Sequence, residues 1–163
     1  MSINIYIIED NNLKATSISD FFNQEFHGIL NISIFSSFQS GLRAIEKSHP
    51  NLIILDMTLP TFDRKPNARE GRMRPLGGYD LMHKMVHKSI ASDVIVVTQL
   101  ETFGEGEEEI SFLEITERCK NDFQEFFLGS VYFDQGGINW QPLLKSLVDI
   151  SLNKKENYEN INS

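Results

Sequence analysis

The sequence predicts an α/β fold in which one open parallel sheet of five strands carries helices on both faces. Five short, mostly apolar runs, typical of strands buried on both sides, lie at about residues 3–8, 29–36, 51–56, 93–98 and 129–134. Helical patterns fill the intervals, as expected for parallel strands joined by right-handed crossovers. A length of 163 residues fits one domain.

The first three helices follow from capping residues, apolar spacing and breakers. Asn11 or Asn12 can cap a first helix, whose expected apolar face is Leu13, Ile18, Phe21, Phe22 and Phe26. The segment GLRAIEKSH predicts a second helix that ends at Pro50, because proline cannot continue it. After Gly77-Gly78, the segment YDLMHKMVHK predicts a third helix.

The last two helices follow the fourth and fifth strands. An acidic helix is expected over about 108–127, with the run from Glu105 to Glu109 near its N-terminal turn; its apolar positions are Ile110, Leu113, Ile115, Phe123, Phe126 and Phe127. The segment NWQPLLKSLVDISL predicts the last helix, with Trp140 as a core or interface residue. The domain therefore covers residues 1–152, with inserted loops at about 61–76 and 101–112, and residues 153–163 form a polar tail that we expect to be frayed.

Composition and charge narrow the function classes. The chain is 40% apolar and 23% charged, and it contains no run of about 20 apolar residues as a membrane span requires. The N-terminus is unlike a secretory signal and Cys119 is the single cysteine, so we expect a cytoplasmic protein. The net charge of −8 disfavours direct nucleic-acid binding. Residues 101–125 carry a charge of −7 and residues 61–76 a charge of +3, which suits a protein partner.

Acidic residues follow two of the predicted strands. In the flavodoxin-like strand order 2-1-3-4-5, the first and third strands are neighbours, and ligands bind at the carboxyl ends of the strands. Glu9 and Asp10 follow the first strand and Asp56 ends the third, so the three acids should meet at that edge. Carboxylate oxygens suit Mg²⁺, which relieves their mutual repulsion. The sequence therefore predicts a metal-assisted acidic pocket.

The motifs IIED, LIILDMTLP, GG-YDLM and VIVVT resemble those of the CheY-like receiver domain of two-component response regulators, over about residues 3–152. The resemblance implies that Glu9 and Asp10 bind Mg²⁺ together with Asp56 and the backbone carbonyl of Thr58. It also implies that Asp56 accepts a phosphoryl group and that the Thr98 hydroxyl bonds to that group. Phe133 falls near the aromatic switch position of the family.

The chain departs from the family after the fifth strand. The family has a lysine there that pairs with the phosphoryl group, whereas an ungapped reading places Gln135 or Gly136 at that position. Basic residues of the first insertion are candidate substitutes, with Arg72 and Arg74 as the candidate phosphate clamp; the full set is Arg64, Lys65, Arg69, Arg72 and Arg74. Gln99 also follows Thr98 where the family favours a small residue.

These features indicate a stand-alone receiver in phosphorelay signal transduction rather than an enzyme in its own right. Its expected partners are a sensor histidine kinase or phosphotransfer protein and an unidentified downstream protein bound by docking. The alternative is a pseudo-receiver that binds partners without phosphorylation. A haloacid-dehalogenase-type hydrolase is disfavoured, because its nucleophile ends the first strand with a second Asp two residues on, and here Asp56 ends the third strand and Thr58 follows.

Overall fold

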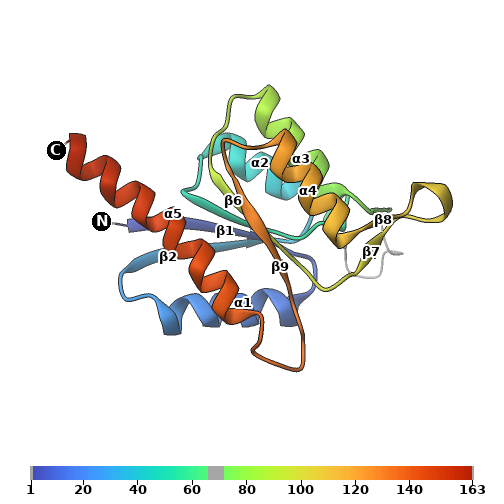
Figure 1. Ribbon diagram of the computed structural model, residues 1–163, viewed down its shortest axis with the longest axis horizontal. Coiled ribbons are helices and arrows are strands. Elements are labelled where there is room, and N and C mark those ends of the chain that lie inside the picture. The colour runs from blue at the N-terminus through green and yellow to red at the C-terminus, as the bar shows by residue number, and fades with distance from the viewer. Residues whose placement is uncertain (1, 66–71, 163) are drawn as a thin grey trace.

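The sheet has the predicted order and direction. The computed structural model describes residues 2–65 and 72–162. The main sheet consists of five parallel strands in the order β2-β1-β3-β6-β9, which confirms the flavodoxin-like fold (Figure 1). These strands are β1 (Ser2–Ile8), β2 (Ile29–Phe35), β3 (Leu52–Leu55), β6 (Asp93–Thr98) and β9 (Phe127–Tyr132). The last strand begins two residues earlier than the sequence predicts.

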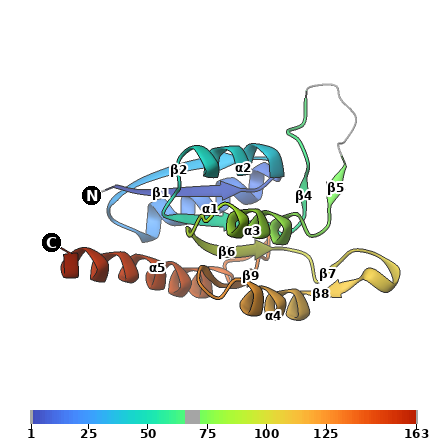
Figure 2. The same cartoon turned by 90° about the horizontal axis from the view of Figure 1, so that it is seen from above.

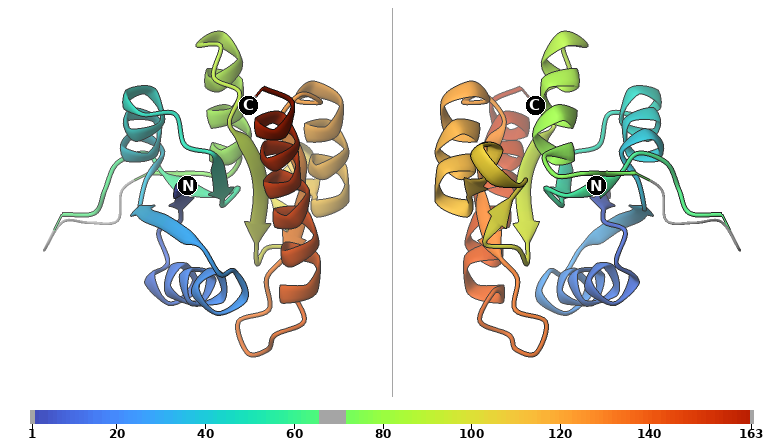
Figure 3. Two further views of the ribbon diagram at one scale, coloured as in Figure 1. Left: turned by 90° about the vertical axis from the view of Figure 1, so that its left-hand side faces the viewer. Right: turned by 90° about the vertical axis from the view of Figure 1, so that its right-hand side faces the viewer.

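Helices cover both faces of the sheet, and the strand pleat divides the core between them (Figure 3). Ile53 and Leu55 of β3 face a layer formed by α2 (Phe38–Lys47), α3 (Gly77–His87) and α4 (Phe112–Asp122). Leu52 and Ile54 face α1 (Asn12–Glu25) and α5 (Gln141–Asn162) on the other side. Because alternate residues point to opposite faces, both sides of each central strand are apolar.

The buried face of α1 differs from the prediction at one position. Asn11 caps the helix by accepting a hydrogen bond from Lys14 N, as expected. Leu13 is 68% exposed, however, and Lys14 is buried in its place. Lys14, Ile18 and Phe21 are spaced four and three residues apart and so share one side of the helix. The expected inward position of Leu13 was therefore wrong.

Both insertions form antiparallel hairpins where the sequence predicts loops. Strand β4 (Leu59–Pro60) pairs with β5 (Met73–Arg74), and Thr61 N donates to Arg72 O. Strand β7 (Thr102–Phe103) pairs with β8 (Ile110–Ser111) around the 3₁₀ turn η1 (Gly106–Glu108). Figure 2 shows both hairpins projecting from the end of the sheet opposite the two termini. Two-residue pairings lack the long alternating pattern that identifies a strand from sequence.

The acidic run does not form the first turn of α4, so this expectation was wrong. Gly104 and Gly106 have φ values of 81° and 62°, a conformation that favours glycine and places the run in the tip of the β7–β8 hairpin. The helix begins at Phe112 instead, because Ser111 Oγ accepts a hydrogen bond from Glu114 N. Leu113, expected to be inward, is 73% exposed.

The C-terminal helix is longer than expected. Residues 153–162, expected as a frayed polar tail, continue α5; the two Lys and two Glu of this stretch favour a helix, whereas its four Asn do not. Ser151 and Lys154 of α5 also bind the Asp93 side chain, which anchors the helix to the start of β6. Trp140 is buried before α5 against Phe21 and Phe133, in agreement with its predicted packing role.

Candidate metal and phosphoryl site

Three acidic side chains meet at the carboxyl edge of the sheet. One carboxylate oxygen from each of Glu9, Asp10 and Asp56 lies within 4.8 Å of the others. Backbone hydrogen bonds fix the two strand ends: Glu9 N donates to Phe35 O at 2.9 Å, and Asp56 N donates to Ile8 O at 3.0 Å. The structure therefore brings together the three acids that the sequence placed at one edge.

A lysine from α1 enters this acidic cluster. The Lys14 ammonium lies 2.5 Å from Glu9 Oε1 and 3.4 Å from Asp56 Oδ1, and it donates a hydrogen bond to Val97 O at 2.8 Å. The Lys14 and Glu9 side chains are 1% and 2% exposed, and that of Asp56 is 12% exposed. A buried ammonium requires such partners, because an unpaired one costs several kcal/mol or more.

Burial alters the acidity of this cluster. It raises the pKa of the Glu9 carboxyl from 4.5 to about 8; the charge of Asp56 adds to this shift, and Lys14 opposes it. Burial also raises the pKa of Asp56, again against the opposing charge of Lys14. Both carboxyls are thus held in an environment that disfavours their negative charge. A cation brought to the cluster would favour the charged forms.

The cluster fits a divalent metal ion by charge and by donor type. When ionised, the three acids carry three negative charges, of which the Lys14 ammonium offsets one. A divalent cation would neutralise the two that remain. Mg²⁺ prefers oxygen ligands from one or two carboxylates completed by water and phosphate. Thr58, expected to add its carbonyl oxygen, lies close by in the β3–β4 segment, where its hydroxyl donates to Pro75 O at 2.9 Å.

Gly78 marks a tight contact behind Asp56. A Cβ atom at this position would lie 2.6 Å from Asp56 O, and Gly78 N donates to Met57 O at 2.8 Å. Only glycine allows this close approach of α3 to the end of β3. The Gly77-Gly78 pair that begins the third predicted helix therefore also packs against the site.

Thr98 and Phe133 lie at the ends of the adjoining strands. Thr98 is buried, and its hydroxyl accepts a hydrogen bond from Leu100 N at 3.3 Å. Phe133 follows β9, donates its N–H to Thr98 O and is buried against Trp140. Tyr132, which is paired with Thr98 across the sheet, is the exposed aromatic residue at the end of β9. The switch role of Phe133 remains a prediction.

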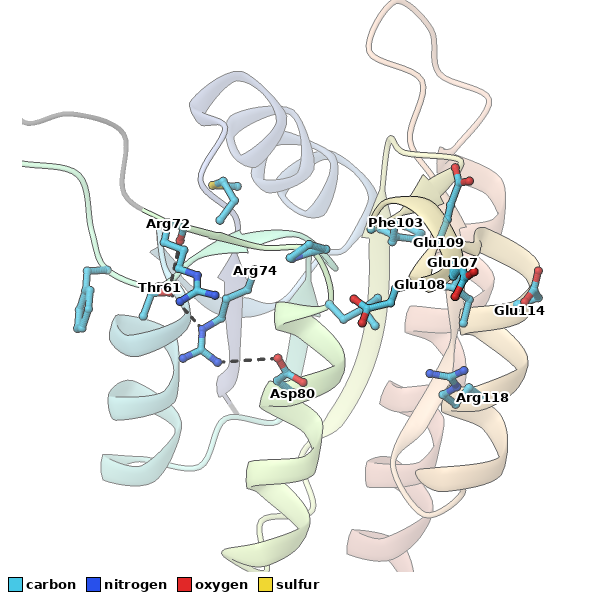
Figure 4. A pocket seen from close by; sticks show the side chains of 16 residues that line it. Thr61, Arg72, Arg74, Asp80, Phe103, Glu107, Glu108, Glu109, Glu114 and Arg118 are labelled. Carbon is cyan, nitrogen blue, oxygen red and sulfur yellow. Dashed lines mark hydrogen bonds and ion pairs between the residues drawn. The ribbon is translucent and has the colours of Figure 1, made fainter.

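Arg72 and Arg74, the two arginines expected as a phosphate clamp, line the space between the β4–β5 and β7–β8 hairpins (Figure 4). Arg74 contacts Thr61 and Asp80, and its guanidinium lies 4.1 Å from the centre of the Phe38 ring. Arg72 is exposed next to Thr61. Arg64, in contrast, reaches the acidic cluster, with its guanidinium 3.8 Å from Asp10 Oδ2. Lys65 is exposed, and Arg69 lies outside the described residues.

A groove of about 1080 Å³ separates the two hairpins. Arg72 and Arg74 line one wall, and Glu107, Glu108 and Glu109 line the other (Figure 4). Residues of the basic segment 61–76 and of the acidic segment 101–125 therefore face each other across this groove, next to the carboxyl edge of the sheet.

Lys14 is the site residue that sequence reasoning missed. The available signal was its helical spacing, because Lys14, Ile18, Phe21 and Phe22 share one face whereas Leu13 aligns with Ser17 and Asp20. A lysine on the apolar face of a helix, next to a strand that ends in acids, indicates a buried ion pair.

Comparisons with known proteins bear on the fold and the family of the chain. The chain is similar to a CheY-like response regulator receiver domain from Methanospirillum hungatei JF-1, with a TM-score of 0.62 and 16% identity over 96% of this chain and 99% of that one. This similarity shows that the chain has the CheY-like, flavodoxin-like fold. No family model matches. Within the described residues, no helix has the length and apolar character of a membrane span.

Two curated relatives match most of the chain. The Detocs response regulatory protein DtcB of Enterobacter cloacae (strain JD6301) is 30% identical over 147 residues, which cover 88% of this chain and 98% of that protein. Protein y4jR of Sinorhizobium fredii (strain NBRC 101917 / NGR234) is 29% identical over 143 residues, 86% of this chain and 93% of that protein. The chain belongs to the response regulator family that includes DtcB.

Proposed function

We propose that the protein is a receiver that binds Mg²⁺ and accepts a phosphoryl group on Asp56. The observation that carries this proposal is the meeting of Glu9, Asp10 and Asp56 oxygens within 4.8 Å at the carboxyl edge of the sheet. This arrangement supports a metal ion bound directly beside a carboxylate nucleophile. The expected metal ligands are Glu9, Asp10, Asp56 and the carbonyl oxygen of Thr58.

The reaction transfers a phosphoryl group from a phosphohistidine or a small phosphodonor. An Asp56 carboxylate oxygen attacks the phosphorus and forms a new P–O bond. The P–N bond of the phosphohistidine breaks, and its electron pair stays on the imidazole nitrogen, which a proton then neutralises. A bound Mg²⁺ supplies charge neutralisation between the two anionic reactants. The product is an acyl phosphate on Asp56, with Thr98 as the expected hydroxyl donor to it.

The phosphorylated protein is proposed to act by docking to another protein. A sensor histidine kinase or phosphotransfer protein supplies the phosphoryl group, and the protein itself serves as its acceptor in a cytoplasmic relay. The similarity to a Detocs response regulatory protein supports a role in signalling. The groove between the two charged walls, next to the site, is the surface proposed for a protein partner of mixed charge.

A pseudo-receiver is the second candidate, and one observation favours it. The Lys14 ammonium already contacts both Glu9 and Asp56, so it partly satisfies the acidic cluster without a metal ion. In that case the protein would bind its partner in one fixed state, and the Asp56 carboxylate would take no phosphoryl group.

Intact mass spectrometry separates the two candidates. Wild type, Asp56→Asn and the control Asp134→Asn are incubated with Mg²⁺ and acetyl phosphate, and each is repeated with a chelator. Asp134 is exposed after β9, so its variant should behave as wild type. We expect one phosphoryl adduct on wild type and on the control, none on Asp56→Asn and none without Mg²⁺. A wild type that gains no adduct under these conditions would support the pseudo-receiver.

A further inference from the structure

Lys14 is a fully buried cation with three protein oxygen atoms near its ammonium group. It is 1% exposed, and its nitrogen lies near Glu9 Oε1, Val97 O and Asp56 Oδ1, at 2.5, 2.8 and 3.4 Å. The contact with Val97 O is a hydrogen bond, and the contacts with Glu9 and Asp56 are ion pairs. The long 3.4 Å contact to Asp56 is the weakest of the three.

The ammonium lies at the one edge where a phosphoryl group on Asp56 must sit. Its three partners come from the ends of β1, β6 and β3, the three central strands of the sheet. Val97 immediately precedes Thr98, the expected hydroxyl donor. A group attached to Asp56 would therefore lie within a side-chain movement of the Lys14 nitrogen.

The end of the last strand offers no such cation. The segment from Phe133 to Leu144 contains no lysine or arginine. Phe133, the residue that follows β9, is buried, and the Lys14 nitrogen lies 5.9 Å from the centre of its ring. The space next to the end of β9 thus holds an aromatic ring, with the ammonium reaching it from α1.

We propose that Lys14 is the phosphoryl-binding cation of this receiver, supplied by the first helix instead of the segment after the last strand. In the unphosphorylated protein its ammonium pairs with Glu9 and Asp56. After transfer, the Asp56 carboxyl is part of an acyl phosphate and has lost its own negative charge, so it is a poorer acceptor than the phosphoryl oxygens. The ammonium therefore exchanges its ion pair with Asp56 for a hydrogen bond to a phosphoryl oxygen. This inference rests on the proposed phosphorylation of Asp56.

A purely structural ion pair with Glu9 is the competing explanation. Such a pair would keep Glu9 in place and would not respond to a group bound at Asp56. Lys14→Met keeps the length of the side chain and removes its charge, and Lys14→Arg keeps the charge. Lys120→Met is the matched control, because Lys120 is exposed on α4 and pairs only with Glu117 among the contacts described for it.

The test measures affinity for beryllofluoride, a phosphoryl mimic, in the presence of Mg²⁺. The fluorescence of Trp140, the single tryptophan, reports binding because its ring lies 4.9 Å from that of Phe133. Loss of a charge-assisted hydrogen bond should weaken beryllofluoride binding by about tenfold or more in Lys14→Met. Lys120→Met should bind beryllofluoride as wild type does. Mg²⁺ alone should bind Lys14→Met at least as tightly as it binds wild type, because a competing cation has left the cluster.

Nuclear magnetic resonance of the wild-type Lys14 side chain keeps the test decisive if Lys14→Met fails to fold. Its ammonium resonance should shift when beryllofluoride is added to the Mg²⁺-loaded protein. Equal beryllofluoride affinity in wild type and Lys14→Met, or a Lys14 resonance that does not respond, would overturn this inference but not the proposed function. A wild type that binds no beryllofluoride and gains no phosphoryl adduct would overturn the proposed function and this inference together.

Discussion

Glu9, Asp56 and Lys14 are ionisable side chains that the sheet and α1 largely shield from water. Burial raises the pKa of both carboxyls, and the Lys14 ammonium lies between them. The sequence predicted the acids, because they follow apolar strands at a known edge of the fold. It did not predict Lys14, because one lysine near the start of an imperfectly amphipathic helix also fits an exposed position.

The raised pKa of Glu9 predicts how stability changes with pH in the metal-free protein. Between about pH 4.5 and pH 8 the folded state binds more protons at Glu9 than the unfolded state does, so this carboxyl makes the free energy of unfolding fall as pH rises. The decrease is at most about 1.4 kcal/mol per pH unit for one proton. Glu9→Gln should remove it. Urea unfolding with a chelator at several pH values measures the difference between wild type and Glu9→Gln.

If the free energies of unfolding of wild type and Glu9→Gln differ by a constant amount from pH 5 to pH 8, Glu9 does not titrate in this window. Glu25→Gln is a suitable control, because Glu25 is exposed at the end of α1. Its free energy of unfolding should follow that of wild type at each pH.

At the level of the elements, the five main strands and the helices between them follow from apolar runs and caps. The hairpins β4–β5 and β7–β8 do not, because each pairs two residues with two and depends on contacts across the chain. The start of α4 was misjudged for a related reason. Glutamate favours the first turn of a helix, but Gly104 and Gly106 turn the chain there, and Ser111 caps the helix later.

The contact between α5 and β6 predicts the effect of a substitution. Ser151 is fully buried, and its hydroxyl donates to Asp93 Oδ2 at 2.7 Å. Ser151→Ala leaves this carboxylate with one fewer donor and should lower the free energy of unfolding by about 1–3 kcal/mol. Ser146→Ala on the same helix removes an exposed hydroxyl and should change it by less than about 0.5 kcal/mol. Denaturant titration of both variants measures the two effects, and equal values would contradict this account of the helix anchor.

On the scale of the whole molecule, the strand order brings distant segments to one edge. The parallel arrangement places β1 beside β3, so acids 46 or 47 positions apart in the sequence become neighbours. The alternation of strands and helices was enough to predict this order, because few topologies satisfy the crossover rule. The relation between the two hairpins was not predictable, because the charged walls of their groove come from segments with no periodic pattern.

Metal binding should stabilise the whole fold. With Mg²⁺ at about 100 times its dissociation constant, the folded state gains about 2.7 kcal/mol. For a domain of this size, the melting temperature should rise by about 5–10 °C. Asp10→Asn should lose most of this rise, whereas the exposed control Asp134→Asn should keep it. Differential scanning calorimetry with Mg²⁺ and with a chelator measures the shift, and an equal rise in both variants would place the ion elsewhere.

The most direct measurement is the anomalous diffraction of crystals grown with Mn²⁺ in place of Mg²⁺. We predict one peak within about 2.5 Å of carboxylate oxygens from Asp10 and Asp56, as expected for direct coordination. The contrary result is a cluster without an anomalous peak at high Mn²⁺ concentration, in which the Lys14 ammonium still contacts both Glu9 and Asp56. That result would mean that the lysine, and not a metal ion, balances these acids.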